Sequence, residues 1–198
     1  MSSFSCIFLM KNLTEKQISS TPIFKGKLLD VWSDQVQLPS GGVSVREYIQ
    51  HPGAVVMIPV LPDGKILLIR QFRYPIGEVE IELPAGKIDP GESLLETVHR
   101  ELEEETGYKA RKVTPLVEIH PCIGYSTERM WIFLVEDLVE TEVNTDHDEF
   151  IELFPTKLSD CLNWIRSGKI KDIKAIIGIF WADKILSGRW TPPKPEPI

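Results

Sequence analysis

The chain has 198 residues, of which 42% are hydrophobic and 26% charged, and its net charge is −7. These values are typical of a globular protein with a sizeable core, and they disfavour nucleic acid and anionic membrane surfaces as partners, because both attract basic patches. An acidic protein that handles phosphate groups needs a local cation to mask the repulsion.

Residues 1–50 predict a small β appendage. Residues 1–22 are polar and rich in Ser and Thr, and we expect no regular structure there. An extended run from Leu28 to Val36 leads into the turn sequence Pro39-Ser40-Gly41-Gly42, and alternation resumes at Val43, which predicts a β-hairpin. A sheet this small is marginally stable alone, so it must pack on something larger or on a partner chain.

The rest of the chain predicts a mixed-sheet α/β domain over residues 51–190. Four apolar segments are expected to be strands: 54–60, 66–69, 113–119 and 131–135. One helix is expected to end at Gly107, and apolar residues at helical spacing predict two more, before Gly168 and Gly188. The proline-rich tail at 191–198 cannot hold regular structure.

Cysteine usage and the N-terminus predict a cytoplasmic protein. The cysteines show neither a metal-ligand spacing nor an even disulfide set, which is typical of a reducing compartment: Cys6, Cys122 and Cys161. The apolar run at 6–10 is too short for a signal-peptide core or a membrane span. Met10 competes with Met1 as the translation start.

The helix before Gly107 carries acidic residues at the end where a helix disfavours them. Glu101 and Glu105 are four residues apart, so they lie on one face beside the apolar stripe, partly shielded from water. Glu103 points nearly the other way and is expected to face solvent. Each carboxylate at the negative C-terminus of a helix costs roughly a few tenths of a kcal/mol. Such a cluster is typical of a Mg²⁺ site, and a solvated acidic face is the alternative.

A wider pattern surrounds these glutamates and follows G-x5-E-x7-R-E-U-x-E-E-x-G-U, where U is a bulky apolar or aromatic residue. The residues that match it are Gly86, Glu92, Arg100, Glu101, Leu102, Glu104, Glu105, Gly107 and Tyr108. A chance match at a given start is on the order of one in a billion. The pattern resembles the box of the Nudix hydrolases, and the surrounding strand order is similar to that family from about residue 50 to residue 190. The resemblance implies an α/β/α sandwich and hydrolysis of a phosphoanhydride bond.

The Nudix resemblance also implies a divalent-metal site. Glu101 and Glu105 are the expected ligands of Mg²⁺, or of Mn²⁺ in its place, and the resemblance adds the carbonyl of Ala85. The bound ion polarises the diphosphate and lowers the pKa of the attacking water. Three further box residues are expected to support the cluster, the arginine by neutralising it: Glu92, Glu104 and Arg100.

Two segments resemble the ADP-ribose pyrophosphatase and nucleotide-sugar branch of the family. The first is Gln71 to Pro75 before Glu82-Leu83-Pro84-Ala85-Gly86. Its Arg73 is expected to contact the substrate diphosphate and Glu82 to bind substrate, and a surface arginine on a strand is the alternative for Arg73. The second is the N-terminal sheet, which in that branch packs across a two-fold axis. The resemblance therefore implies a homodimer in which Arg46 binds substrate in the partner's cleft.

The loop after the box, from His120 to Glu128, is similar to the S-P-G-x-S-x-E segment of this branch, and Ser126 is expected to bind substrate. Ile123 stands where a proline marks ADP-ribose enzymes. This departure leaves room for GDP-mannose or other nucleoside diphosphate sugars beside ADP-ribose, which would be cleaved to AMP and ribose 5-phosphate.

A carboxylate from a late loop orients or deprotonates the attacking water in this branch. Residues 144–149 take that place here, and alignment on the following strand selects Glu149, which is also an expected metal ligand. His147 is the alternative base, because its pKa lies nearer neutrality.

Two other functions compete with a nucleoside diphosphate sugar hydrolase. An RNA 5′-pyrophosphohydrolase would need a basic approach surface, which a net charge of −7 does not indicate. A module that senses nucleotide sugars without turnover typically loses box carboxylates, and all of them are present in this sequence. The favoured prediction is therefore an enzyme.

Overall fold

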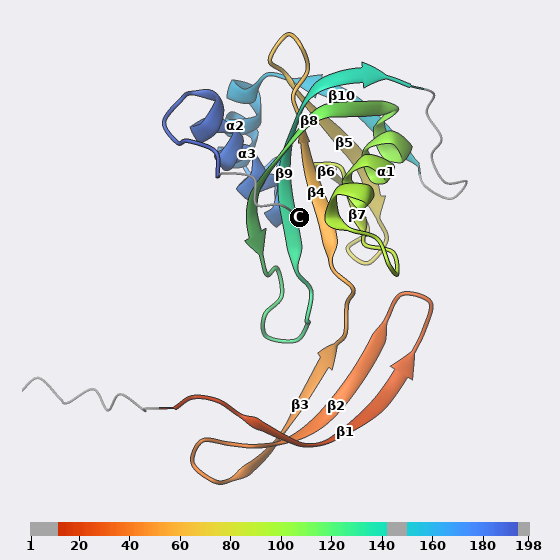
Figure 1. Cartoon of the computed structure of the whole chain (residues 1–198), viewed down its shortest axis with the longest axis vertical. Helices are drawn as coiled ribbons and strands as arrows, with labels where there is room; N and C mark the ends of the chain where they lie inside the picture. Colours follow the sequence, from red (N-terminus) through yellow and green to blue (C-terminus); the bar gives the residue numbers. More distant parts are fainter. Residues whose placement is uncertain (1–11, 142–149, 194–198) are drawn as a thin grey trace, which may run out of the picture. The chain divides into compact units, whose positions relative to one another are not determined.

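The structure is a computed structural model that describes residues 12–141 and 150–193 (Figure 1). The described chain falls into two compact units. The N-terminal unit contains the residues up to His51 together with the loop Cys122–Thr127, and the main unit contains Pro52–Pro121 and the chain from Glu128 onward. The loop joins the N-terminal unit through its backbone, because the Ile49 N–H donates to the Tyr125 carbonyl at 2.9 Å.

The N-terminal unit is an antiparallel sheet in the order β1-β2-β3. Its strands are β1 (Lys16–Lys25), β2 (Asp30–Gln37) and β3 (Val43–Ile49). The predicted turn between β2 and β3 forms, with the Leu38 N–H donating to the Gly42 carbonyl at 2.8 Å. Asp34 and Val36 are the buried residues among those described in this unit, so the sheet has almost no core of its own.

Strand β1 corrects the prediction that residues 1–22 lack regular structure. All of its residues are exposed, so its sequence shows no alternation of apolar and polar side chains. Backbone pairing to β2 holds it instead, with register shifts between Gln17 and Ser19 and between Pro22 and Phe24. Pro22 has no backbone N–H to donate. It is tolerated in β1 because one side of an edge strand is not hydrogen-bonded to a neighbouring strand.

The main unit contains one mixed and one antiparallel sheet. The mixed sheet has the order β7-β4-β9-β8, in which β4 and β9 are parallel. Its strands are β4 (Ala54–Pro59), β7 (Ala85–Lys87), β8 (Tyr108–Ile119) and β9 (Met130–Glu140). The antiparallel sheet has the order β10-β5-β6 and consists of β5 (Ile66–Arg73), β6 (Glu78–Glu82) and β10 (Ile151–Thr156).

Helices cover both faces of the mixed sheet (Figure 1). They are α1 (Leu94–Thr106), α2 (Leu158–Arg166) and α3 (Ile173–Leu186). Alternate residues of β4 face opposite ways: Val55 and Met57 share a core with Val98 of α1, whereas Val56 and Ile58 share one with Ile179 of α3. The predicted α/β/α sandwich is confirmed. No helix in the described part of the chain is long and apolar enough to cross a membrane.

Candidate active site

Helix α1 is fixed at both ends, which sets the phase of its glutamates. At the start, the Ser93 side chain accepts from the Glu96 N–H and the Glu96 side chain accepts from the Ser93 N–H, a capping box. At the end, Gly107 has a φ of 70° and donates to the Glu103 carbonyl at 2.8 Å. The last turn carries no basic residue, so its carboxylates face the unfavourable end of the helix dipole.

The two glutamates predicted to bind metal meet two consecutive main-chain residues. Glu105 is 5% exposed, and its Oε2 accepts from the Ala85 N–H at 2.9 Å. Glu101 lies against Gly86 so closely that a Cβ placed there would be 1.8 Å from its carboxyl carbon. Gly86 is therefore needed for close approach of a carboxylate, and the structure brings Glu101, Glu105 and Ala85 together.

Arg100 donates hydrogen bonds to three carboxylates of the box. Its Nε donates to Glu92 at 2.8 Å, and its Nη1 donates to Glu101 at 2.7 Å and to Glu104 at 3.0 Å. The hydrogen bond from Arg100 lowers the pKa of Glu92 to about 2. These contacts fit the expected role of Arg100 as a neutralising partner of the acidic cluster.

Glu103, predicted to face solvent, is not plain solvent surface. Its side chain is 33% exposed and pairs with Lys109 at 2.9 Å. The prediction of a residue apart from the site fits this position, and the ion pair is an addition that the helical spacing alone did not indicate.

The donor set fits a divalent cation. Among residues 12–141 and 150–193, no three His, Cys, Asp or Glu side chains form a cluster that could hold a metal ion. Mg²⁺, however, is usually bound through one or two carboxylates, with water and substrate phosphates completing its shell. Glu101 and Glu105, with the adjoining main chain at Ala85, supply oxygen donors of that kind.

Arg73, predicted to contact the diphosphate, is held side-on by Glu82. Its Nε and Nη2 donate to the two Glu82 oxygens at 2.6 and 2.7 Å. The Arg73 side chain is 41% exposed and that of Glu82 is 3% exposed. The hydrogen bond to Glu82 and, more weakly, the charge of Glu105 raise the pKa of Arg73, so the charge of Arg73 interacts with one of the glutamates predicted to bind metal.

Sequence reasoning missed three charged residues that line one cavity with Glu82, namely Lys171, Asp172 and Lys174. Lys174 contacts Glu82 and lies 3.1 Å from Asp172, and Lys171 pairs with Glu80 at 2.9 Å. All of these side chains, together with Arg73 and Ile76, line a cavity of about 240 Å³. Burial raises the pKa of Asp172 against the opposing charge of Lys174. A lysine in the first turn of a helix, where the dipole disfavours it, was the available signal.

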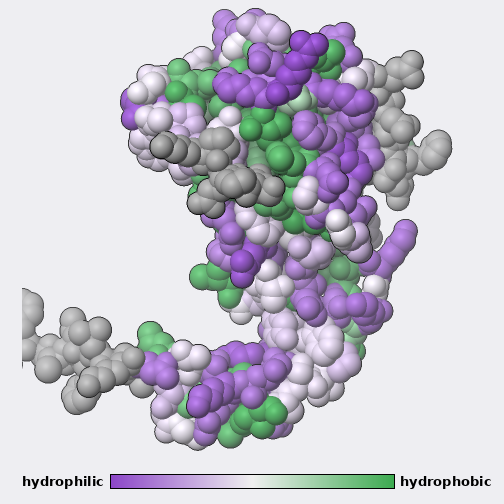
Figure 2. Space-filling view, in the orientation of Figure 1, coloured by the Kyte–Doolittle hydropathy of each residue, from purple (hydrophilic) through white to green (hydrophobic). Residues whose placement is uncertain are grey.

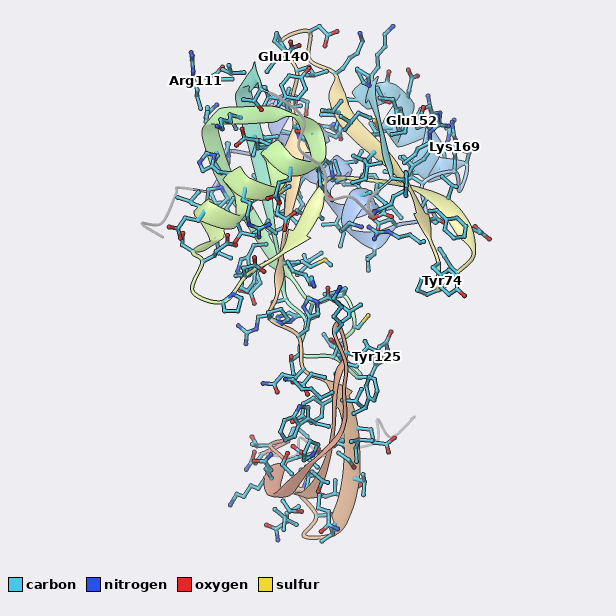
Figure 3. All side chains as sticks on the ribbon, turned by 90° about the vertical axis from the view of Figure 1, so that its right-hand side faces the viewer. Tyr74, Arg111, Tyr125, Glu140, Glu152 and Lys169 are labelled. Atoms are coloured by element: carbon cyan, nitrogen blue, oxygen red, sulfur yellow. The ribbon has the colours of Figure 1, made fainter. Side chains whose placement is uncertain are left out.

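Arg46 and Ser126, two further predicted substrate residues, line one hollow of about 320 Å³ in the N-terminal unit. Strand β3 and the loop form it, and Tyr125 stands beside the sheet (Figure 3). Arg46 pairs with Glu15 at 2.5 Å, and the Ser126 N–H donates to the Cys122 carbonyl at 3.0 Å. Ile123 is 83% exposed on the same loop.

Glu149 and His147, the predicted base and its alternative, lie outside the described residues. Strand β10 follows them, and its first residue, Ile151, pairs with Gln71 on the strand that carries Arg73. Both assignments therefore stay predictions.

Fold and box together define a class of α/β/α proteins in which the glutamates of a helix meet the main chain of a short strand. The NUDIX domain matches residues 50–169. An ADP-ribose pyrophosphatase of Bacillus subtilis (strain 168) is 41% identical over 172 residues, covering 86% of this chain and 93% of that protein. The chain therefore belongs to the Nudix family, and it is a hydrolase of that family.

Other relatives have different names. A methanol dehydrogenase activator of Bacillus methanolicus is 35% identical over 85% of this chain and 92% of its own length. A GDP-mannose pyrophosphatase of Yersinia enterocolitica is 32% identical over 73% and 82%. A crystal structure of an ADP compounds hydrolase superposes with a TM-score of 0.81 at 24% identity, covering 90% of this chain and 98% of that one, which shows the shared fold.

Proposed function

We propose that the chain hydrolyses the diphosphate bond of nucleoside diphosphate sugars, with ADP-ribose as the first candidate and Mg²⁺ or Mn²⁺ as cofactor. The convergence of the Glu101 and Glu105 carboxylates on Ala85 and Gly86 carries this proposal. The substrate class is supported by relatives named ADP-ribose pyrophosphatase and GDP-mannose pyrophosphatase.

The site residues have separate roles in the proposed hydrolysis. Glu101, Glu105 and the Ala85 carbonyl would hold the cation, which when bound polarises phosphate oxygens and lowers the pKa of water. Arg73 binds the diphosphate with the guanidinium edge that Glu82 does not occupy. Water attacks one phosphorus, Glu149 accepts its proton with His147 as the alternative, and the products are a nucleoside monophosphate and a sugar phosphate.

Substrate breadth is the first testable consequence. We expect ADP-ribose to yield AMP and ribose 5-phosphate, and at least one other nucleoside diphosphate sugar to be cleaved with a comparable kcat/KM. The reason is that the exposed Ile123 leaves the loop freer than a proline would, and pockets with few obligatory hydrogen bonds discriminate only roughly 10–200-fold. The measurement is kcat/KM for ADP-ribose, GDP-mannose, UDP-glucose, NADH, diadenosine polyphosphates, nucleoside triphosphates and 5′-triphosphorylated RNA.

Ile123→Pro is the matched variant for this experiment and should narrow the profile towards ADP-ribose. An unchanged ratio would exclude position 123 from the choice of sugar. Selectivity above about 10⁴-fold for ADP-ribose in the unaltered protein would contradict a loosely discriminating pocket.

The N-terminal sheet supports a second proposal, that two chains form a homodimer through it. Apolar side chains lie on its surface (Figure 2). They include Ile18, Ile23, Phe24, Val43 and Val45, each more than half exposed. Light scattering at micromolar concentration should give a dimer, and deletion of residues 1–49 should abolish activity. A fully active monomer, or an active truncated chain, would contradict this proposal.

A further inference from the structure

A buried lysine shares its carboxylate partner, Glu82, with the arginine that we propose to bind the diphosphate. Lys174 is in the first turn of α3, and 9% of its side chain is exposed. The N-terminal end of a helix repels a cation, and a buried ammonium group is unfavourable unless carboxylates compensate it. Lys174 therefore departs from the first rule and satisfies the second through Glu82 and Asp172, and such departures concentrate where function requires them.

Glu82 links this lysine to Arg73. One carboxylate oxygen of Glu82 accepts from Arg73 Nε, and the other accepts from both Arg73 Nη2 and Lys174 Nζ. Although burial acts to raise the pKa of Glu82, hydrogen bonds from Arg73 and the charge of Lys174 outweigh it and lower that pKa. Glu82 is thus an ionised group between two cations, and the loss of either one would let the carboxylate turn toward the other.

The side-on pairing decides which donors of the Arg73 guanidinium are not used by Glu82. Glu82 takes hydrogens of Nε and Nη2, which leaves the edge formed by Nη1 and the outer hydrogen of Nη2. Such an edge matches two phosphate oxygens. A carboxylate held in one orientation therefore fixes the direction in which the arginine presents its phosphate-binding donors.

Helix α3 packs on Leu83, the residue that follows Glu82 at the end of β6. The Asp172 side chain caps the helix by accepting from the Ala175 N–H at 2.9 Å. One turn further along, Gly178 packs so closely on Leu83 that a Cβ there would be 2.5 Å from the leucine Cδ1. The cap and this close packing place the first turn of α3, with Lys174, beside Glu82.

The cavity next to these residues is not an anion site of its own. Lys171 pairs with Glu78 and Glu80, and Lys174 pairs with Glu82 and Asp172. Every lysine that lines it is already balanced by carboxylates. The charges around this cavity therefore compensate one another, and Arg73 is the exposed partner of the buried Glu82.

We propose that Lys174 is a positioning residue that orients Arg73 toward the substrate diphosphate through Glu82. This rests on the proposed hydrolysis of nucleoside diphosphate sugars. It also gives Glu82, predicted to bind substrate, a role that acts through Arg73 instead of by direct contact.

The test is a double-mutant cycle on the full-length protein with ADP-ribose and Mg²⁺. Lys174→Met should raise KM about tenfold, the lower end of what loss of a charge-assisted hydrogen bond produces, with kcat changed less than about threefold because Glu101 and Glu105 are untouched. In an Arg73→Gln background, the same substitution should raise KM no further. Lys171→Met is the matched control, because it removes a lysine from the same cavity that does not contact Glu82, and KM should stay within about twofold.

The outcomes separate the two proposals. An unaltered protein that does not cleave ADP-ribose or another nucleoside diphosphate sugar overturns both. An active protein in which folded Lys174→Met keeps its KM, or raises it equally in both backgrounds, overturns only the positioning role. If Lys174→Met does not fold, Glu82→Gln replaces it in the cycle with the same expectation, because the amide keeps the shape but not the charge. Equal KM effects of Glu82→Gln with and without Arg73 would then overturn the proposal.

Discussion

We expect Glu105→Gln and Glu101→Gln each to lower kcat by at least about 10²-fold. Each substitution keeps the length of the side chain and removes one negative charge from the pair that meets Ala85 and Gly86. Glu105 is 5% exposed, so solvent cannot replace the lost charge around a cation. Initial rates at saturating ADP-ribose and Mg²⁺ measure this effect, and thermal unfolding checks that the variants are folded.

Glu103→Gln is the control on the same helix. It breaks only the pair with Lys109, and pairs of this exposed kind contribute about 0–1 kcal/mol. Its kcat should stay within about twofold of the unaltered protein. A loss as large as that of Glu105→Gln would show that the metal ligands are wrongly assigned.

Gly86→Ala disturbs the same cluster without changing a charge. Gly86 lies in β7 and is not among the glycines with positive φ, so alanine fits the backbone, but its methyl group would collide with the Glu101 carboxylate. We expect kcat to fall about 10²-fold, as for other misplacements of about 1 Å. In a Glu101→Gln background the additional loss should be small, since both changes act on one side chain.

Removal of divalent metal is the second large effect, and we expect it to abolish turnover. The chain carries a net charge of −7, and without a cation Glu101 and Glu105 repel the diphosphate that they are proposed to help cleave. Protein treated with EDTA and then freed of chelator should be inactive, and Mg²⁺ or Mn²⁺ should restore it. Turnover at full rate in EDTA, after tightly held metal has been removed, would contradict the carboxylate site.

Apolar runs and helical spacing predicted the parts of the fold that are buried. The strands that begin at Ala54 and Ile66 start as continuous apolar runs. All residues of β4 and the first four residues of β5 are buried in the structure. The helical phase of Glu101 and Glu105 followed from their spacing of four. Strand β1 has no buried residue, so its pairing to β2 left no pattern in the sequence.

Contacts between distant residues could not be predicted in this way. Lys174 and Glu82 are 92 residues apart and belong to a helix and a strand whose packing depends on the whole sandwich. The loop Cys122–Thr127 likewise joins the N-terminal unit through Ile49, a pairing that local sequence does not specify. The Nudix box was visible because its spacing carries the chemistry, whereas the network behind Arg73 is visible only in three dimensions.

The most direct measurement combines substrate, metal and ligand residue in one assay. Metal-free protein is incubated with ADP-ribose, Mg²⁺ is added, and the products are identified by mass spectrometry for the unaltered chain and for Glu105→Gln side by side. If the diphosphate is hydrolysed, the unaltered chain should form AMP and ribose 5-phosphate in equal amounts after Mg²⁺ is added. Glu105→Gln should form them at a rate at least about 10²-fold lower. Equal product formation by both proteins, or none from ADP-ribose by the metal-loaded unaltered chain, would contradict the account.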